Sequence, residues 1–159
     1  MKYFIDVVVN PNKNYGFGFP DPSIAIDRIN SILLYDIYSN EEIVFSDIDE
    51  RLMIISYLEF VKDSILFGYN ILSYDIPYLK KRCEILDIEL PSFDVRCMLN
   101  DFQNSVDLES YILQSVIDYI TGKRFDYSLG DVENYKIIYN FLYKSEVRDD
   151  KLELLLLNK

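Results

Sequence analysis

The chain has no histidine and only two cysteines, Cys83 and Cys97, among its 159 residues. Without histidine it can form neither a Ser-His or Cys-His catalytic triad nor a histidine-ligated zinc site. Two isolated thiols are typical of a reducing, intracellular setting rather than of a disulfide scaffold, so we expect a cytoplasmic protein.

Long apolar runs are also missing. The longest ones, such as residues 154–157, fall far short of the roughly 20 residues that span a bilayer. The run that follows Met1 and Lys2 ends in no small-residue cleavage site. We therefore expect neither a membrane partner nor a signal peptide.

Positive charge is scarce, with 16 Lys and Arg against 27 Asp and Glu and a net charge of −11. This balance counts against tight, non-specific binding to nucleic acid, which depends on cations that displace counterions from phosphates. It does not count against a nuclease that concentrates carboxylates in one cleft and takes its positive charge from metal ions.

Half of the residues are hydrophobic, which is enough for a core, and the length fits a single domain over residues 1–159. β-rich runs predict strands over residues 2–9, 31–38, 42–45, 64–69 and 93–98. A loop rich in Asn, Gly and Pro is predicted over 10–22. The short break at 39–41 predicts a hairpin, so the sheet should begin with an antiparallel meander.

Helices are predicted between the later strands and after them. Ser46 and Asp47 are candidate caps of the first helix, and a second is expected near residues 75–86. The third has an apolar stripe that ends at Gly122, with members Leu108, Ile112, Val116 and Tyr119. The fourth has the stripe Val132, Tyr135, Tyr139 and Leu142. This order indicates an α/β fold with a mixed sheet flanked by helices.

Two short motifs carry more specific information. Residues 68–79 read GYNILSYDIPYL, in which Asn70 precedes the pair Tyr74-Asp75. Residues 127–131 read YSLGD, and the four-residue spacing places Tyr127 and Asp131 on one helical face. Both motifs resemble the second and third motifs of the 3′–5′ exonuclease domain of family-B DNA polymerases. The resemblance extends over about residues 3–143 and leaves 144–159 as a C-terminal extension.

The resemblance implies an RNase H-like fold and the tyrosine branch of the DEDD exonucleases. It implies that Asp6, Asp75 and Asp131 hold two Mg²⁺ or Mn²⁺ ions, with Asp6 bridging both. Asp75 would then serve the leaving-group side and Asp131 the water side, while Tyr127 orients the attacking water. Taken singly, Asp75 could equally cap its helix, and each of the other three could have an ordinary structural role.

The first motif departs from the family, which has Asp-x-Glu on its first strand. Here Asp6 is followed by Val8 at the position of the Glu. Strand side chains alternate, so residues 6 and 8 face the same side and one carboxylate is missing there. Water could fill the gap, or another acid could reach in, and the candidates are Asp27, Asp36 and Asp94.

Two further groups of residues are candidates for substrate binding. The aromatic residues Tyr15, Phe17 and Phe19 could stack on unpaired bases, or could cover the sheet. Asn70 and Lys80 are candidate contacts to the strand, with Lys80 beginning a basic run through Arg82 that could also be an ordinary solvated helix face.

Two functions follow from these residues. The first is a metal-dependent 3′–5′ exonuclease that acts on single-stranded nucleic acid, with DNA as the expected substrate and a replication or repair protein as a conceivable partner. The second is a degenerate exonuclease-like domain that has become a binding or scaffolding module. Three retained acids and Tyr127 favour the first function, whereas Val8 and the acidic surface favour the second.

Overall fold

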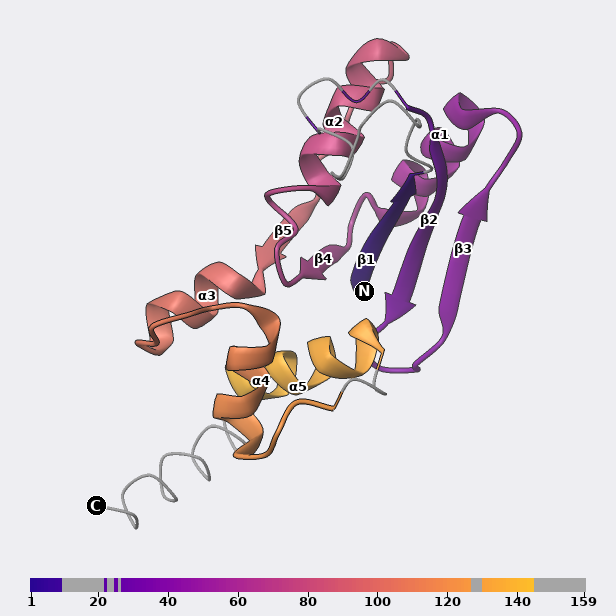
Figure 1. Ribbon diagram of the computed structural model, residues 1–159. Coiled ribbons are helices and arrows are strands. Elements are labelled where there is room, and N and C mark those ends of the chain that lie inside the picture. The colour runs from indigo at the N-terminus through magenta and orange to yellow at the C-terminus, as the bar shows by residue number, and fades with distance from the viewer. Residues whose placement is uncertain (10–21, 23–24, 26, 127–129, 145–159) are drawn as a thin grey trace. The chain divides into compact units, whose positions relative to one another are not determined.

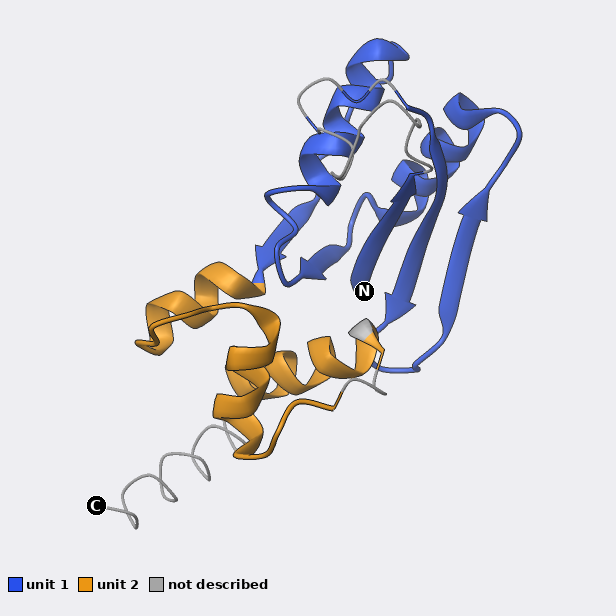
Figure 2. Cartoon of the chain, viewed as in Figure 1, with its two compact units in different colours: residues 1–97 blue, residues 98–159 orange. Residues whose placement is uncertain are grey.

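The computed structural model describes residues 1–9, 22, 25, 27–126 and 130–144. The chain divides into two compact units, Met1–Cys97 and Met98–Lys159 (Figure 2). The first unit contains the sheet and two helices, and the second contains helices. The expectation of one domain stays a prediction. No helix in the described ranges is long and apolar enough to cross a membrane.

The first unit is built on a five-stranded sheet in the order β3-β2-β1-β4-β5 (Figure 1). The strands are β1 (Lys2–Val9), β2 (Ile29–Asp36), β3 (Glu42–Ser46), β4 (Ile65–Gly68) and β5 (Asp94–Cys97). The pairs β1–β2 and β2–β3 are antiparallel, whereas β1–β4 and β4–β5 are parallel. The predicted α/β fold, with an antiparallel meander leading into a mixed RNase H-like sheet, is confirmed.

The helices of the first unit are α1 (Glu50–Val61) and α2 (Asp75–Ile85). α1 packs on β2 and β3, and α2 packs on β1. Ring contacts join α1 to the sheet, with Tyr3 and Phe60 at 5.8 Å and Phe45 and Tyr57 at 5.6 Å between centroids. The area that these contacts remove from water stabilises the helix on the sheet, and the edge-on packing of Phe45 and Tyr57 adds to it.

A buried ion pair connects α1, α2 and the segment that leads into β2. Arg82 donates from Nε and Nη2 to the two carboxylate oxygens of Glu50, at 2.5 and 2.6 Å. Its Nη1 donates to the carbonyl of Ala25 at 3.0 Å, and the amide of Ile29 donates to Glu50 at 3.3 Å. For Arg82, both possibilities raised for the basic run, a phosphate contact and a solvated helix face, are wrong, because its guanidinium is buried and committed to these partners.

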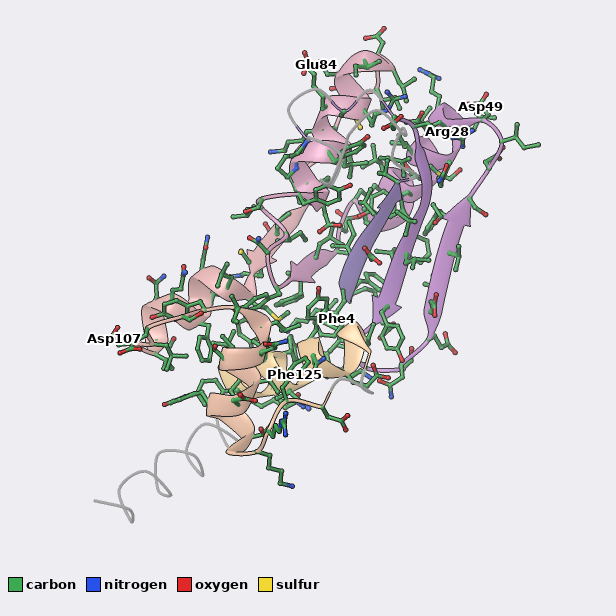
Figure 3. The ribbon with its side chains drawn as sticks, in the orientation of Figure 1. Phe4, Arg28, Asp49, Glu84, Asp107 and Phe125 are labelled. Atoms are coloured by element: carbon green, nitrogen blue, oxygen red, sulfur yellow. The ribbon has the colours of Figure 1, made fainter. Side chains whose placement is uncertain are left out.

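The N-cap residue of α1 differs from the predicted ones. Asp49 is the N-cap residue, and its carboxylate accepts the amide of Leu52 at 3.1 Å. Asp47 instead accepts the amide of Asp49 at 2.9 Å, so it closes the preceding turn, and Ser46 ends β3. Arg28 lies beside Asp49 (Figure 3) and donates to the carbonyls of residues 47 and 48 at 2.7 and 2.6 Å.

The second unit contains α3 (Met98–Ser105), α4 (Leu113–Thr121) and α5 (Asp131–Tyr143). α4 ends at Gly122, as predicted, because that residue adopts φ +65°. Its start was predicted too early, since Leu108 lies before the helix and Ile112 is its N-cap. The Tyr111 hydroxyl explains the late start, because it accepts the amide of Leu108 and donates to the carbonyl of Val106, closing a non-helical turn.

Two other expectations for this unit need correction. Helix α3 was not predicted, and Met98 begins it rather than ending a strand. The buried face of α5 is rotated from the predicted stripe, because only Tyr139 of that stripe is buried. The buried residues of α5 are Asn134, Ile138, Tyr139 and Phe141. Apolar spacing alone did not select the correct face, since both faces of this helix carry large apolar side chains.

We predict that Glu50→Ala lowers the free energy of unfolding by about 3–5 kcal/mol, because it leaves the buried Arg82 charge without its partner. Urea denaturation followed by circular dichroism measures the change. The matched control is Glu59→Ala, which removes one side of the exposed Glu59–Lys62 pair and should leave stability unchanged. Equal effects of the two substitutions would show that the buried pair does not hold the first unit together.

Candidate active site

Asp75 is delivered to the sheet by a tight turn after β4. Gly68 ends this strand, and a Cβ atom at that position would lie 2.7 Å from the Cβ of Ile71. Such a contact is too close for any residue with a side chain, so glycine permits the turn. The chain then enters α2 at Asp75, whose Oδ1 accepts the amide of Val7 at 3.0 Å.

This hydrogen bond takes the place of a backbone hydrogen bond between β1 and β4. In the described part of the chain, the pairing of β1 with β4 runs from Lys2 to Phe4, which lies opposite Phe67. Farther along β1, the amide of Val7 is met by the carboxylate of Asp75 instead of a strand carbonyl. A buried amide needs such an acceptor, so the carboxylate both completes the sheet and is fixed at its centre.

The carboxylate of Asp6 lies close enough to act electrostatically on that of Asp75. Burial and, to a lesser degree, the negative charge of Asp6 raise the pKa of Asp75 to about 6, although hydrogen bonds from the amide of Val7 and from its own backbone amide act to lower it. Asp6 itself is exposed on the central strand of the sheet. The structure therefore brings two of the predicted acids, Asp6 and Asp75, into one electrostatic environment.

The Asp6–Asp75 pair fits a hard divalent cation in its chemistry. Both groups present carboxylate oxygens, and a bound cation would favour the ionised form of Asp75 that burial and the charge of Asp6 disfavour. Within the described residues, however, no three acidic or thiol side chains lie close enough together to hold one ion.

Val8 lies where the sequence places it. It is partly exposed, whereas the intervening Val7 is buried, and the register shift in β1 comes only after Val8. Asp6 and Val8 therefore share a face of β1. A carboxylate at position 8 would stand on the same side of the sheet as Asp6.

The structure separates the acids that were considered as substitutes for the missing Glu. Asp36 lies opposite Tyr3 and accepts the amides of residues 38 and 39, so it belongs to the β2–β3 turn. Asp94 lies level with Ile65 and Lys2, about 13 Å from the level of Asp6 along β1. Neither can replace the Glu.

Asp27 is the remaining candidate. It precedes β2, whose first residue pairs with Val9, so it lies at the same end of the sheet as Val8. Its backbone carbonyl accepts the hydroxyl of Tyr78 at 2.8 Å. It does not, however, form a three-acid group with Asp6 and Asp75 in the described structure.

The predicted substrate contacts Asn70 and Lys80 both lie in the described part of the chain. Asn70 is exposed in the turn after β4, where its Oδ1 accepts the hydroxyl of Ser73 at 2.8 Å. Lys80 is exposed on α2. Both residues are open to solvent, and their role in binding stays a prediction.

The other predicted site residues cannot be placed. Tyr127 and the aromatic residues Tyr15, Phe17 and Phe19 lie outside the described residues. Asp131 begins α5, as predicted, but its side chain is not described. Their participation in the site stays a prediction.

Sequence reasoning missed the backbone amide of Val7 as a partner of Asp75. No side-chain pattern signals such a bond, because a main-chain donor carries no residue type. The only available hint was the match of the second motif, which marked Asp75 as a site residue without showing what holds it.

We predict that Asp75→Asn makes the protein more stable than the wild type above pH 6, by about 2 kcal/mol at pH 8. The reason is that the folded pKa of Asp75 exceeds its ordinary value of 3.8, so the wild type loses stability between pH 4 and pH 6 as this group ionises. Asn keeps an oxygen for the amide of Val7 but does not ionise. Urea unfolding at pH 4 and pH 8 tests this, and a variant no more stable than wild type at pH 8 would contradict it.

A search of curated proteins finds no match. The model of the DNA polymerase family B exonuclease domain matches residues 22–121, well over half of the chain. The matched segment includes Asp75 and its motif but ends before Tyr127 and begins after Asp6. Together with the confirmed order of strands and helices, the match shows that the chain belongs to the family of exonuclease domains of family-B DNA polymerases.

Proposed function

We propose that the protein is a metal-dependent 3′–5′ exonuclease that shortens single-stranded DNA. The observation that carries this proposal is the pair of carboxylates, Asp6 and Asp75, held at the centre of the sheet with the pKa of Asp75 raised to about 6. Two carboxylates kept close together at the cost of mutual repulsion favour a cation-binding role. Membership of an exonuclease-domain family supports nucleic acid as the substrate.

In this proposal Asp6, Asp75 and Asp131 would hold Mg²⁺ or Mn²⁺, with Asp75 serving the leaving group and Asp131 the attacking water. The bound ions would supply Lewis-acid stabilisation of the phosphodiester and of the attacking water. Tyr127 orients that water. Asn70 and Lys80 contact the strand, with Lys80 countering part of the phosphate charge.

We also propose a cellular location, a weak affinity for DNA and a partner protein, on the basis of the composition and the family. Both cysteines are free thiols, which supports a reducing, cytoplasmic location. The net charge of −11 favours weak binding of DNA that depends on the few cations near the site. A replication or repair protein that delivers the strand would offset this weakness.

Val8 supports a second candidate function, that of a catalytically degenerate domain that binds without cleaving. At this position the family motif has an acid, and a side chain of Val offers no ligand to a cation. Two acids in place of three on the sheet side of the site would hold a divalent ion more weakly, because the charge of the ligands sets the affinity for hard cations. The experiments below distinguish the two functions.

We predict that the protein, with Mn²⁺, shortens a 5′-labelled single strand from its 3′ end, and that Asp6→Asn and Asp131→Asn each lower the rate at least about 100-fold. Denaturing gel electrophoresis resolves the products. Asp94→Asn is the matched control, because this exposed acid lies at the other end of the sheet and its loss should leave the rate unchanged. A ladder that survives Asp131→Asn would show that the cleavage does not depend on the proposed site.

We also predict that Val8→Glu increases Mn²⁺-dependent cleavage, because the new carboxylate stands on the face of β1 that carries Asp6. The partly exposed position tolerates a charged side chain, and unfolding measurements check that it does. Val8→Gln, which has the same size but no charge, is the control and should produce no gain.

The size of the gain separates the two functions. A large gain from undetectable cleavage means that the natural protein is a degenerate domain that binds its partner without cutting. A small gain over clear wild-type cleavage means that another ligand or water already completes the site. A folded Val8→Glu variant that binds Mn²⁺ no better than Val8→Gln would show that position 8 does not face the cations.

A further inference from the structure

β3 forms one edge of the sheet, and in the described part of the chain it pairs with β2 alone (Figure 1). The amide of Asp36 donates to the carbonyl of Glu41 at 2.9 Å, so the backbone groups of residue 41 face β2. These groups alternate in direction along an antiparallel strand. Residues 43 and 45 therefore bond to β2, whereas the amides and carbonyls of residues 42, 44 and 46 point outward, where they are available to a further strand.

This edge lacks the features that usually protect an exposed strand from pairing. Native edges are blunted by Pro, by Lys, by bulges or by short length. β3 contains no Pro, Lys or Arg, and its five residues pair with β2 without a register shift. The opposite edge strand, β5, has four residues and carries the exposed charges of Asp94 and Arg96. β3 is therefore the less protected of the two edges.

Apolar side chains at β3 stay partly open to solvent on both faces of the sheet. Val44 is 54% exposed on one face. On the other face Phe45 is half-buried, and the ring of Phe60, 5.5 Å from that of Phe45, belongs to a residue that is 46% exposed. Because strand side chains alternate, an added strand would cover Val44 with one row of side chains and Phe45 with the other. This burial would add to the backbone hydrogen bonds.

The charges beside β3 indicate the kind of strand that fits. Glu41 and Glu42 are exposed at its start and Asp47 just after its end, and residues 41–47 include no Lys or Arg. Neither Glu41 nor Glu42 forms an ion pair with a described residue. Arg28 approaches the other end, where it donates to the carbonyl of Asp47 at 2.7 Å. The uncompensated negative charge is therefore concentrated at Glu41 and Glu42.

A second copy of this chain fits the edge poorly. Antiparallel pairing of two β3 strands about Val44 would place Glu41 of each copy opposite Asp47 of the other. Like charges directly opposite one another destabilise a sheet, and each copy has a net charge of −11. The same charges would attract a cationic strand.

We propose that the outer edge of β3 binds an extended segment of a partner protein, which adds antiparallel to the sheet. The segment carries Lys or Arg opposite Glu41 and Glu42, with β-branched residues opposite residues 43–45. The antiparallel direction continues the meander of β1, β2 and β3. Main-chain hydrogen bonds supply the affinity of such an addition, and side chains supply its specificity. This inference goes beyond the exonuclease proposal and requires neither metal nor cleavage.

A designed peptide tests the proposal on the full chain. The probe is acetyl-Lys-Thr-Ile-Val-Ile-Lys-Lys-amide, whose Val would pair with Val44 and whose last two Lys would meet Glu42 and Glu41. We expect calorimetry to detect its binding. A peptide with Glu in place of each Lys should bind at least about tenfold more weakly, because its charges repel those of the edge.

Methylation of single peptide nitrogens tests whether the probe binds as a strand. In the proposed register the amide of the central Val faces β3, so methylating its nitrogen removes a hydrogen bond and should weaken binding about tenfold. The amide of the Ile that follows points away from β3. Methylating that nitrogen is the matched control and should leave the affinity unchanged.

Substitutions in the protein locate the binding. Val44→Lys places a cation at the centre of the edge and should weaken binding of the cationic peptide at least about tenfold. Ile85→Lys is the matched control, because this residue of α2 is similarly exposed, at 50%, and α2 packs on β1. Glu42→Lys should weaken binding of the cationic peptide and strengthen binding of the Glu peptide. A general loss of structure would not produce this reversal.

The proposal is overturned if the cationic peptide fails to bind at about 1 mM. It is also overturned if both methylated peptides lose affinity equally, or if Val44→Lys binds the probe as the wild type does. A dimer in sedimentation equilibrium that Val44→Lys converts to a monomer would make a second copy the occupant, and would overturn the proposed partner. Each of these results leaves the exonuclease proposal intact, because cleavage is measured separately.

Discussion

The buried pair of Glu50 and Arg82 is the interaction on which the first unit depends. It ties α1 to α2 and, through the carbonyl of Ala25 and the amide of Ile29, ties both helices to the start of β2. Buried ion pairs contribute less to net stability than to orientation, because removing two charges from water costs most of what their attraction returns. Arg82 lies about two helical turns after Asp75 on α2. Fixing Arg82 therefore also fixes the rotation of α2, which aims Asp75 at β1.

The site that results works against the stability of the fold. Burial and the nearby charge of Asp6 disfavour the ionised form of Asp75, and hydrogen bonds from the amide of Val7 and from its own backbone amide offset this only in part. Such strain is expected where a charged group is kept for a ligand rather than for packing. Val8 leaves the face of β1 that carries Asp6 without a second carboxylate, so it adds no further repulsion to the charges of Asp6 and Asp75.

Several features were predictable from the sequence because they depend on near neighbours along the chain. Gly122 ends its helix in the left-handed conformation, as glycine allows. The alternation of strand side chains correctly placed Asp6 and Val8 on one face. The late start of α4 was not predictable, because the hydroxyl of Tyr111 closes a turn where the apolar spacing of Leu108 and Ile112 indicated helix.

By itself the sequence determined the order of the strands and most of the helices and the mixed sheet, and its second motif singled out Asp75 as a candidate. Only the tertiary structure decided what Asp75 binds, because the amide of Val7 is 68 residues away and becomes its neighbour only when α2 packs on β1. Only the tertiary structure placed Arg82 in an ion pair within a basic run that resembles a solvated surface. Residue types and their spacing record local preferences, whereas partners across the sheet are set by which backbone groups its packing leaves unpaired.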